Sequence, residues 1–226
     1  LSDFVYYAGK SRTWISFITT LWTASIATML SMLIGIPVGY TLSRYKLPYP
    51  QLMKTLIDLP VMVPPAAIGV FLLGVFKSAP LVNITQILGI KVDHALPGVI
   101  VAQFTVTVSF CIRLVMASFE TVNPKFEAVA RSLGASLPRT FFKVSLPLAK
   151  NGLIASLIIV WARAVAEWES LMLFVGGIQG RTDVMPFAVY LDFVGGKLGW
   201  ALTISMLCVL IAIGSMYALY RVKGKT

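Results

Sequence analysis

Residues 13–43 read TWISFITTLWTASIATMLSMLIGIPVGYTLS and contain no Asp, Glu, Lys or Arg. The hydrocarbon core of a bilayer is about 30 Å thick, and an α-helix needs roughly 20 mostly apolar residues to cross it. Because this stretch exceeds that length, it predicts a transmembrane helix over residues 14–40. It also indicates that lipid, and not a folded protein core, is the solvent for this part of the chain.

The composition of the whole chain agrees with a membrane protein. Of its 226 residues, 58% are hydrophobic and 12% are charged, whereas about 25% of an average soluble domain is charged. The formal net charge is +10, but Lys and Arg lie at the ends of apolar runs, as membrane orientation requires, so we expect no nucleic-acid partner. The two cysteines lie in apolar runs and there is a single histidine, so we expect no disulfide, metal or cofactor.

Four further apolar runs predict spans over residues 56–76, 95–119, 152–174 and 198–220. With the first span they make a single all-α transmembrane domain that occupies residues 1–226. Pro60, Pro64 and Pro65 lie in the second span, which we therefore expect to be kinked or broken. An accommodated kink and a moving hinge are both compatible with these prolines.

Lys and Arg are distributed unevenly between the two sides that these spans define. One side holds eleven of them, namely Arg44, Lys46, Lys54, Lys125, Arg131, Arg139, Lys143, Lys150, Arg221, Lys223 and Lys225. The other side holds six, namely Lys10, Arg12, Lys77, Lys91, Arg181 and Lys197. Because Lys and Arg are enriched on the cytoplasmic side, we expect a multi-pass cell-membrane protein with its N-terminus outside and its C-terminus in the cytoplasm.

The segment 121–147, which is cytoplasmic in this topology, carries the signals of two short helices. Asn123 is a good N-cap, Pro124 suits the first helical position, and Gly134 suits a helix stop. Residues 137–147 read LPRTFFKVSLP. The first proline of this stretch predicts a second helix start, and the last predicts a turn into the fourth span.

The first of these two helices is expected to be amphipathic. Apolar side chains recur on one of its faces at helical spacing, namely Phe126, Val129, Ala130 and Leu133. Glu127 and Arg131 are four residues apart and can pair on another face. Such a helix can lie on the lipid surface or dock on another subunit.

The amino-acid sequence of this segment resembles the EAA loop of ABC importer permeases. The matching residues are Glu127, Ala128, Ala130, Gly134, Leu146 and Pro147, with Val129 in place of the second alanine of the family. In that family the loop is a coupling helix that sits in a groove of the ATPase subunit. The resemblance therefore implies an ATPase-coupling role for these residues and for Arg131.

The resemblance extends over most of the chain. Three stretches are similar to molybdate and tungstate permeases, namely DLPVMVPP at 58–65, DHALPG at 93–98 and WARAVAEW at 161–168. Glu169 and Ser170 stand where that group usually has Gly-Ala, and sulfate permeases share much of the pattern. The resemblance implies the type I importer (MetI-like) fold and import of a tetrahedral oxyanion, molybdate or tungstate, with sulfate as the alternative. It also implies a homodimer, two cytoplasmic ATPase subunits and an external substrate-binding protein.

Apart from Asp58, two residues into the second span, four charged residues lie inside the expected spans, namely Arg113, Arg163, Glu167 and Glu169. A charge at the bilayer centre costs about 2.5–3.5 kcal/mol on insertion scales, so each should face protein or water. Arg163 and Glu167 are four residues apart and can pair. Either this pair only fixes helix packing, or Arg113 or Arg163 lends positive potential to an anion pathway.

The sequence contains no Gly-x-x-x-x-Gly-Lys-Ser/Thr motif and thus no phosphate-binding loop. We therefore expect a permease subunit that is not itself an enzyme and takes its energy from a partner ATPase. A secondary transporter often shows inverted repeats, which we do not find here. A membrane anchor would need neither broken spans nor charges within them.

Overall fold

The computed structural model describes residues 2–45, 49–78, 87, 92, 94–178 and 182–223. Asp93 and the basic residues Lys46, Lys91, Arg181 and Lys225 lie outside these ranges. The elements are α1 (Ser2–Ala8), α2 (Ser11–Arg44), α3 (Pro50–Met62), α4 (Pro65–Lys77), α6 (Leu96–Glu120), α7 (Lys125–Ser132), α8 (Leu137–Thr140), the π-helix η1 (Phe141–Ser145), α9 (Leu146–Val165), α10 (Glu169–Phe174), α11 (Met185–Val194) and α12 (Leu198–Lys223). All regular structure within the described ranges is helical, which confirms the all-α class.

Four helices are long and apolar enough to cross a membrane, namely Ser11–Arg44, Leu96–Glu120, Leu137–Val165 and Leu198–Val222. A bent pair, α3 and α4, adds a fifth if its two arms count as one span. The pair is bent by 101° at the break between its arms. Both Val63 and Pro64, which lie at this break, have extended backbone, with ψ values of 132° and 134°. Proline disfavours a helical conformation in the residue before it, which explains a clean break at Pro64 and Pro65.

The helix of the fourth span differs from the expected range of 152–174 at both ends. It is continuous from Leu137 to Val165, so the turn expected at Pro147 is wrong. A π-helical turn, η1, directly precedes this proline, and such turns let a helix continue past a residue that lacks an N–H. At the other end the helix stops at Val165, and the Glu167 carboxylate then accepts hydrogen bonds from the N–H and hydroxyl of Ser170 at 3.0 and 2.9 Å. This carboxylate caps a new helix, α10, so hydropathy alone placed the end of the span too late.

The core of the molecule is formed by α2, α6 and α9, which pack closely through small residues. A Cβ atom on Gly39 of α2 would lie 2.9 Å from the backbone N of Met116 in α6. A Cβ atom on Gly152 of α9 would lie 2.8 Å from the Cβ of Ser118 in α6. Lipid tails are as apolar as the side chains they contact, so close backbone approach supplies much of the association between membrane helices.

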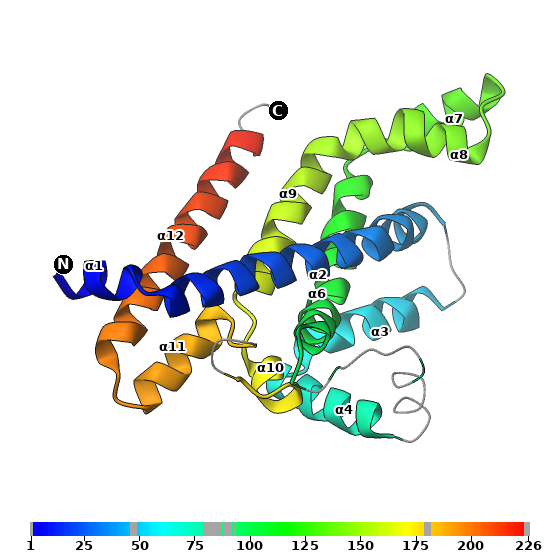
Figure 1. Ribbon diagram of the computed structural model, residues 1–226. Coiled ribbons are helices and arrows are strands. Elements are labelled where there is room, and N and C mark those ends of the chain that lie inside the picture. The colour runs from blue at the N-terminus through cyan, green and yellow to red at the C-terminus, as the bar shows by residue number, and fades with distance from the viewer. Residues whose placement is uncertain are drawn as a thin grey trace.

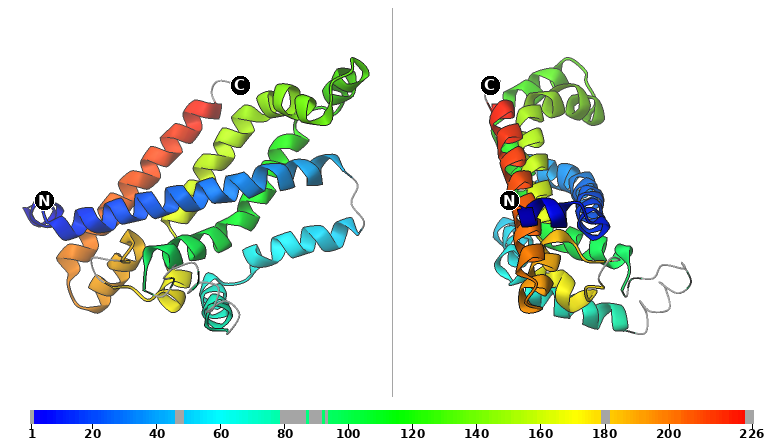
Figure 2. Two further views of the ribbon diagram at one scale, coloured as in Figure 1. Left: turned by 45° about the vertical axis from the view of Figure 1, so that its right-hand side comes forward. Right: turned by 60° about the vertical axis from the view of Figure 1, so that its left-hand side comes forward.

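The remaining helices surround this core. Both Figure 1 and Figure 2 show α7 and α8 projecting beyond the other helices at one end of the molecule. The C-terminal end of α12 points toward the upper part of Figure 1, on the same side as α7, whereas α10 and α11 lie at the opposite, lower side. α10 packs on α4, where a Cβ on Gly69 would lie 2.6 Å from the carbonyl oxygen of Ser170.

Candidate functional site

The projecting segment is built from local signals at both ends of α7. The Asn123 side chain accepts a hydrogen bond from the backbone N–H of Lys125 at 3.0 Å, and the helix spans Lys125–Ser132. Gly134 follows in the left-handed region, with φ of +87°. Its N–H donates to the carbonyl of Arg131 at 3.0 Å. The helix thus starts one residue later than the sequence predicted, at Lys125 and not at Pro124, and Gly134 follows as the expected stop.

The outward face of this segment is apolar and uncovered in the described part of the chain. On α7, Phe126, Val129 and Leu133 are 57%, 58% and 83% exposed. Leu137 and Phe142, in α8 and η1, are exposed as well. Ala128 is exposed and Ala130 half-buried beside them. We call these residues the docking face, because bulky apolar side chains exposed at the tip of a projection mark an interaction surface.

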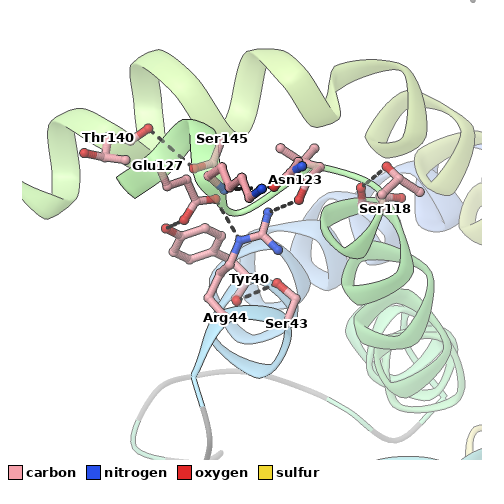
Figure 3. A network of polar contacts seen from close by, with 11 residues as sticks. Tyr40, Ser43, Arg44, Ser118, Asn123, Glu127, Thr140 and Ser145 are labelled. Atoms are coloured by element: carbon pink, nitrogen blue, oxygen red, sulfur yellow. Dashed lines mark hydrogen bonds and ion pairs between the residues drawn. The ribbon is translucent and has the colours of Figure 1, made fainter. Parts of the chain in front are cut away.

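Glu127 points away from the docking face and is only 9% exposed. One carboxylate oxygen accepts a hydrogen bond from Nε of Arg44 at 2.7 Å, and the other accepts from the Tyr40 hydroxyl at 3.1 Å (Figure 3). The expected pair between Glu127 and Arg131 is therefore wrong, and Arg131 is exposed. A buried carboxylate needs a charged partner and further hydrogen bonds, which the end of α2 supplies better than an exposed side chain on the same helix.

Arg44 joins three parts of the molecule. In addition to Glu127, its guanidinium donates to the carbonyl of Val122 after α6 at 2.9 Å (Figure 3). Its side chain is 7% exposed. It lies in the last turn of α2 and Glu127 in the first turn of α7, so each charge also matches the dipole of its own helix. From the sequence, Arg44 was expected only to contribute to the positive charge of the cytoplasmic side. Its position at a span end, on the same side as Glu127, was the signal that could have indicated this contact.

Aromatic packing reinforces this junction. The ring of Tyr40 makes edge contacts with Phe119 of α6 and Phe141 of η1, at centroid distances of 5.2 and 4.8 Å. Leu146 packs against the same buried cluster, whereas Pro147 is exposed. Both residues lie within the continuous helix at the base of the projecting segment and not on the docking face. The docking face is thus attached to α2, α6 and α9 by one network.

Three of the four charges expected within the spans lie in two separate ion pairs, and the fourth, Glu169, is half-buried in the first turn of α10. Arg163 contacts Glu167 at 2.8 Å, as the four-residue spacing predicted. This pair lies at the break between α9 and α10, and Glu167 is 2% exposed. Arg113 of α6 instead contacts Asp58 of α3 at 3.5 Å, a partner that the sequence analysis missed. The structure therefore does not bring Arg113 and Arg163 into one site.

Comparison with known proteins agrees with this geometry. Residues 31–222 match the family model of the binding-protein-dependent transport system inner membrane component. The chain is 31% identical to the molybdate/tungstate transport system permease protein WtpB of Methanocaldococcus jannaschii, over 93% of this chain and 81% of that protein. It is 34% identical to the WtpB protein of Pyrococcus abyssi over 68% of this chain, and this match spans 57% of that protein.

Solved structures share the fold at low sequence identity. A bacterial alginate ABC transporter in complex with an alginate pentasaccharide-bound periplasmic protein matches with a TM-score of 0.75 at 16% identity, covering 96% of this chain and 81% of that one. The inward-facing MetNI methionine ABC transporter matches with a TM-score of 0.68 at 17% identity, covering 93% and 94%. This confirms the type I ABC importer fold of the transmembrane subunits. On the extent of the family match, the chain belongs to the binding-protein-dependent transport system inner membrane components.

Proposed function

We propose that this chain is the transmembrane subunit of an ATP-driven importer for a tetrahedral oxyanion, molybdate or tungstate. The observation that carries the proposal is the docking face of α7, which is apolar and exposed yet held by the buried contact between Glu127 and Arg44. A helix lying passively on lipid has no need of such an anchor. The substrate assignment is supported by relatives named as molybdate/tungstate permeases.

The proposed assembly contains two copies of this chain, two cytoplasmic ATPase subunits and an external protein that delivers the oxyanion. The absence of a phosphate-binding loop from the sequence supports a separate ATPase. The excess of Lys and Arg supports a cytoplasmic location for α7 and for the C-terminal end of α12. Two copies are proposed because the few helices of one chain enclose little space for a pathway.

The mechanism follows from how α7 is attached. ATP binding closes the ATPase pair and moves the two docking faces toward each other. Because Glu127 is tied to Arg44 and Tyr40, the displacement of α7 passes to the end of α2 and to α6 beside it. These helices then turn the pathway outward, and hydrolysis returns it inward. We assign the bend at Pro64 and Pro65 the role of the hinge between α3 and α4.

Reconstitution in liposomes tests this function. The chain, its ATPase and its binding protein are reconstituted together, and ATP hydrolysis is measured with the binding protein loaded with molybdate, tungstate or sulfate. We expect stimulation with molybdate or tungstate and no uptake without ATP. Stimulation by sulfate alone would replace the substrate assignment with the sulfate importer. Uptake that needs no ATP would replace the importer with a secondary transporter.

A further inference from the structure

The contact between Asp58 and Arg113 differs from the other ion pairs of the described residues. Its N–O distance is 3.5 Å, and the two side chains are 51% (Arg113) and 33% (Asp58) exposed. The other three pairs lie at 2.7–2.9 Å, and in each the carboxylate is at most 11% exposed. Long, exposed ion pairs contribute little to stability. This geometry leaves part of the Arg113 guanidinium uncovered in the described chain.

The pair lies in a cleft between α3 and α6 of about 170 Å³, lined by Leu42, Ile57, Asp58, Ile112, Arg113 and Met116. Leu42 is two residues before Arg44, whose network anchors the docking face. Arg113 is seven residues before Glu120, the end of α6, or about 10 Å along the helix axis. The cleft is therefore in the half of the membrane that faces α7.

The helix that carries Asp58 has few packing partners within the described chain. Apart from minor contacts, α3 packs only on α6 among the described elements, and its Leu56, Leu59 and Met62 are 55%, 54% and 79% exposed. The break before Pro64 separates α3 from α4. α4 itself is fixed by its contact with α10 at Gly69. Asp58 therefore lies on an arm of the bent span that a backbone break at Val63 and Pro64 separates from α4.

We propose that the Asp58–Arg113 cleft is an oxyanion site near the cytoplasmic end of the pathway, in which Asp58 is the exchangeable counter-ion of Arg113. This inference rests on the proposed function and deepens it. A guanidinium matches a tetrahedral dianion such as molybdate or tungstate, because its fork of N–H donors binds two oxygens at once. If Arg113 held such an anion tightly and nothing competed for the guanidinium, the anion would be released slowly. When α3 closes on α6, the Asp58 carboxylate takes the place of the anion on Arg113 and drives its release.

Direct binding of tungstate to the purified complex with its ATPase subunits tests the exchange. We expect the Asp58→Asn complex to bind tungstate about tenfold more tightly than the unaltered complex. The substitution removes the carboxylate that competes for Arg113 but keeps the charge-assisted hydrogen bonds between Arg113 and tungstate. Arg113→Gln, added to Asp58→Asn, is expected to abolish that gain. Arg113→Lys serves if the glutamine variant does not assemble, and should keep only part of the gain. Glu169→Gln is the matched control, since it removes one carboxylate from the same chain away from Arg113, and we expect no change.

Three outcomes would overturn the inference. The first is an Asp58→Asn complex whose tungstate affinity is unchanged or equals that of Glu169→Gln. The second is a gain that survives Arg113→Gln. The third is evidence that the ligand is the phosphate of a lipid. In that case the Asp58→Asn complex in phosphatidylcholine vesicles would bind phosphatidylglycerol more tightly, through Arg113, but would not bind tungstate more tightly.

The proposed function can fail separately from this inference. A complex that imports molybdate normally, but in which Asp58→Asn changes no affinity, leaves the importer intact and removes the site. A complex that imports no oxyanion, but in which Asp58→Asn tightens tungstate binding through Arg113, leaves the site intact and removes the importer.

Discussion

Glu127 and Arg44 form a buried ion pair at the point where the projecting segment meets the membrane helices. Their side chains are 11% and 7% exposed, and each has a further partner, the Tyr40 hydroxyl for Glu127 and the Val122 carbonyl for Arg44. Removing one partner of such a pair leaves a desolvated charge, which is far more costly than replacing both. The pair therefore ties the position of α7 to that of α2.

We expect Arg44→Met and Glu127→Met each to lower the free energy of unfolding by about 3 kcal/mol. The double variant should recover a large part of this loss, since two packed apolar side chains need no partner. Thermal unfolding of the purified complex measures these effects. The same single variants should hydrolyse ATP without the stimulation that loaded binding protein produces, because the docking face is no longer tied to α2.

Arg131→Gln is the matched control for this cycle, as Arg131 is exposed on the same helix. We expect a change in unfolding free energy within about 0.5 kcal/mol, typical of exposed positions. Additive losses in the double variant, or a large loss with Arg131→Gln, would contradict the assignment of Arg44 as the partner of Glu127.

At the scale of one element, α7 is a short helix whose ends are set by local chemistry. It begins after Asn123 and Pro124 and ends before Gly134, whose φ is +87°. A side chain at such a backbone angle is strained by about 1–2 kcal/mol even in open space, and the space around Gly134 is open. The glycine is thus needed for its backbone conformation and not for close packing.

We expect Gly134→Val to weaken binding of the ATPase subunit about five- to thirty-fold. The strain of a valine in the left-handed conformation destabilises the C-terminal end of α7 and shifts the helix toward a frayed state. Affinity between the purified permease and its ATPase measures this. Gly214→Ala is the control: Gly214 also has open space around it but lies inside α12, where alanine is favoured. Equal affinities for both variants would show that the cap does not position the docking face.

At the scale of the whole molecule, the orientation in the membrane decides which end meets the proposed ATPase. The docking face and the C-terminal end of α12 lie toward one side, and the connection between α11 and α12 lies toward the other (Figure 1). Ser132 and Lys197 are exposed residues at these two ends. Single cysteines at these positions therefore report the topology.

We expect a membrane-impermeant maleimide added to intact cells to label Lys197→Cys and not Ser132→Cys. In inverted vesicles the pattern should reverse. The unaltered chain gives the background, since Cys111 is buried in α6 and Cys208 is half-buried in α12. Labelling of Ser132→Cys from outside would refute the cytoplasmic position of α7.

Features that depend on neighbouring residues were predicted well. The charge-free run at 13–43 forms part of one long helix, α2. This was predictable because the length of an apolar run is read from consecutive residues and compared directly with the thickness of the bilayer. The break at Pro64 and the boundaries of α7 follow from proline, asparagine and glycine for the same reason. The pair of Arg163 and Glu167 was predictable because helical geometry alone places residues four apart on one face.

What only the tertiary structure decided is which charges meet. Arg44 and Glu127 are 83 residues apart, and Asp58 and Arg113 lie in different helices, so their contacts depend on how α2, α3 and α6 pack. The same packing turned Glu127 inward, toward the end of α2. The sequence by itself determined a membrane protein of broken and unbroken spans with a helical projection. Its fold assigned the partners of Arg44 and Arg113, because a desolvated charge with no opposite charge nearby in the sequence needs one from a distant part of the chain.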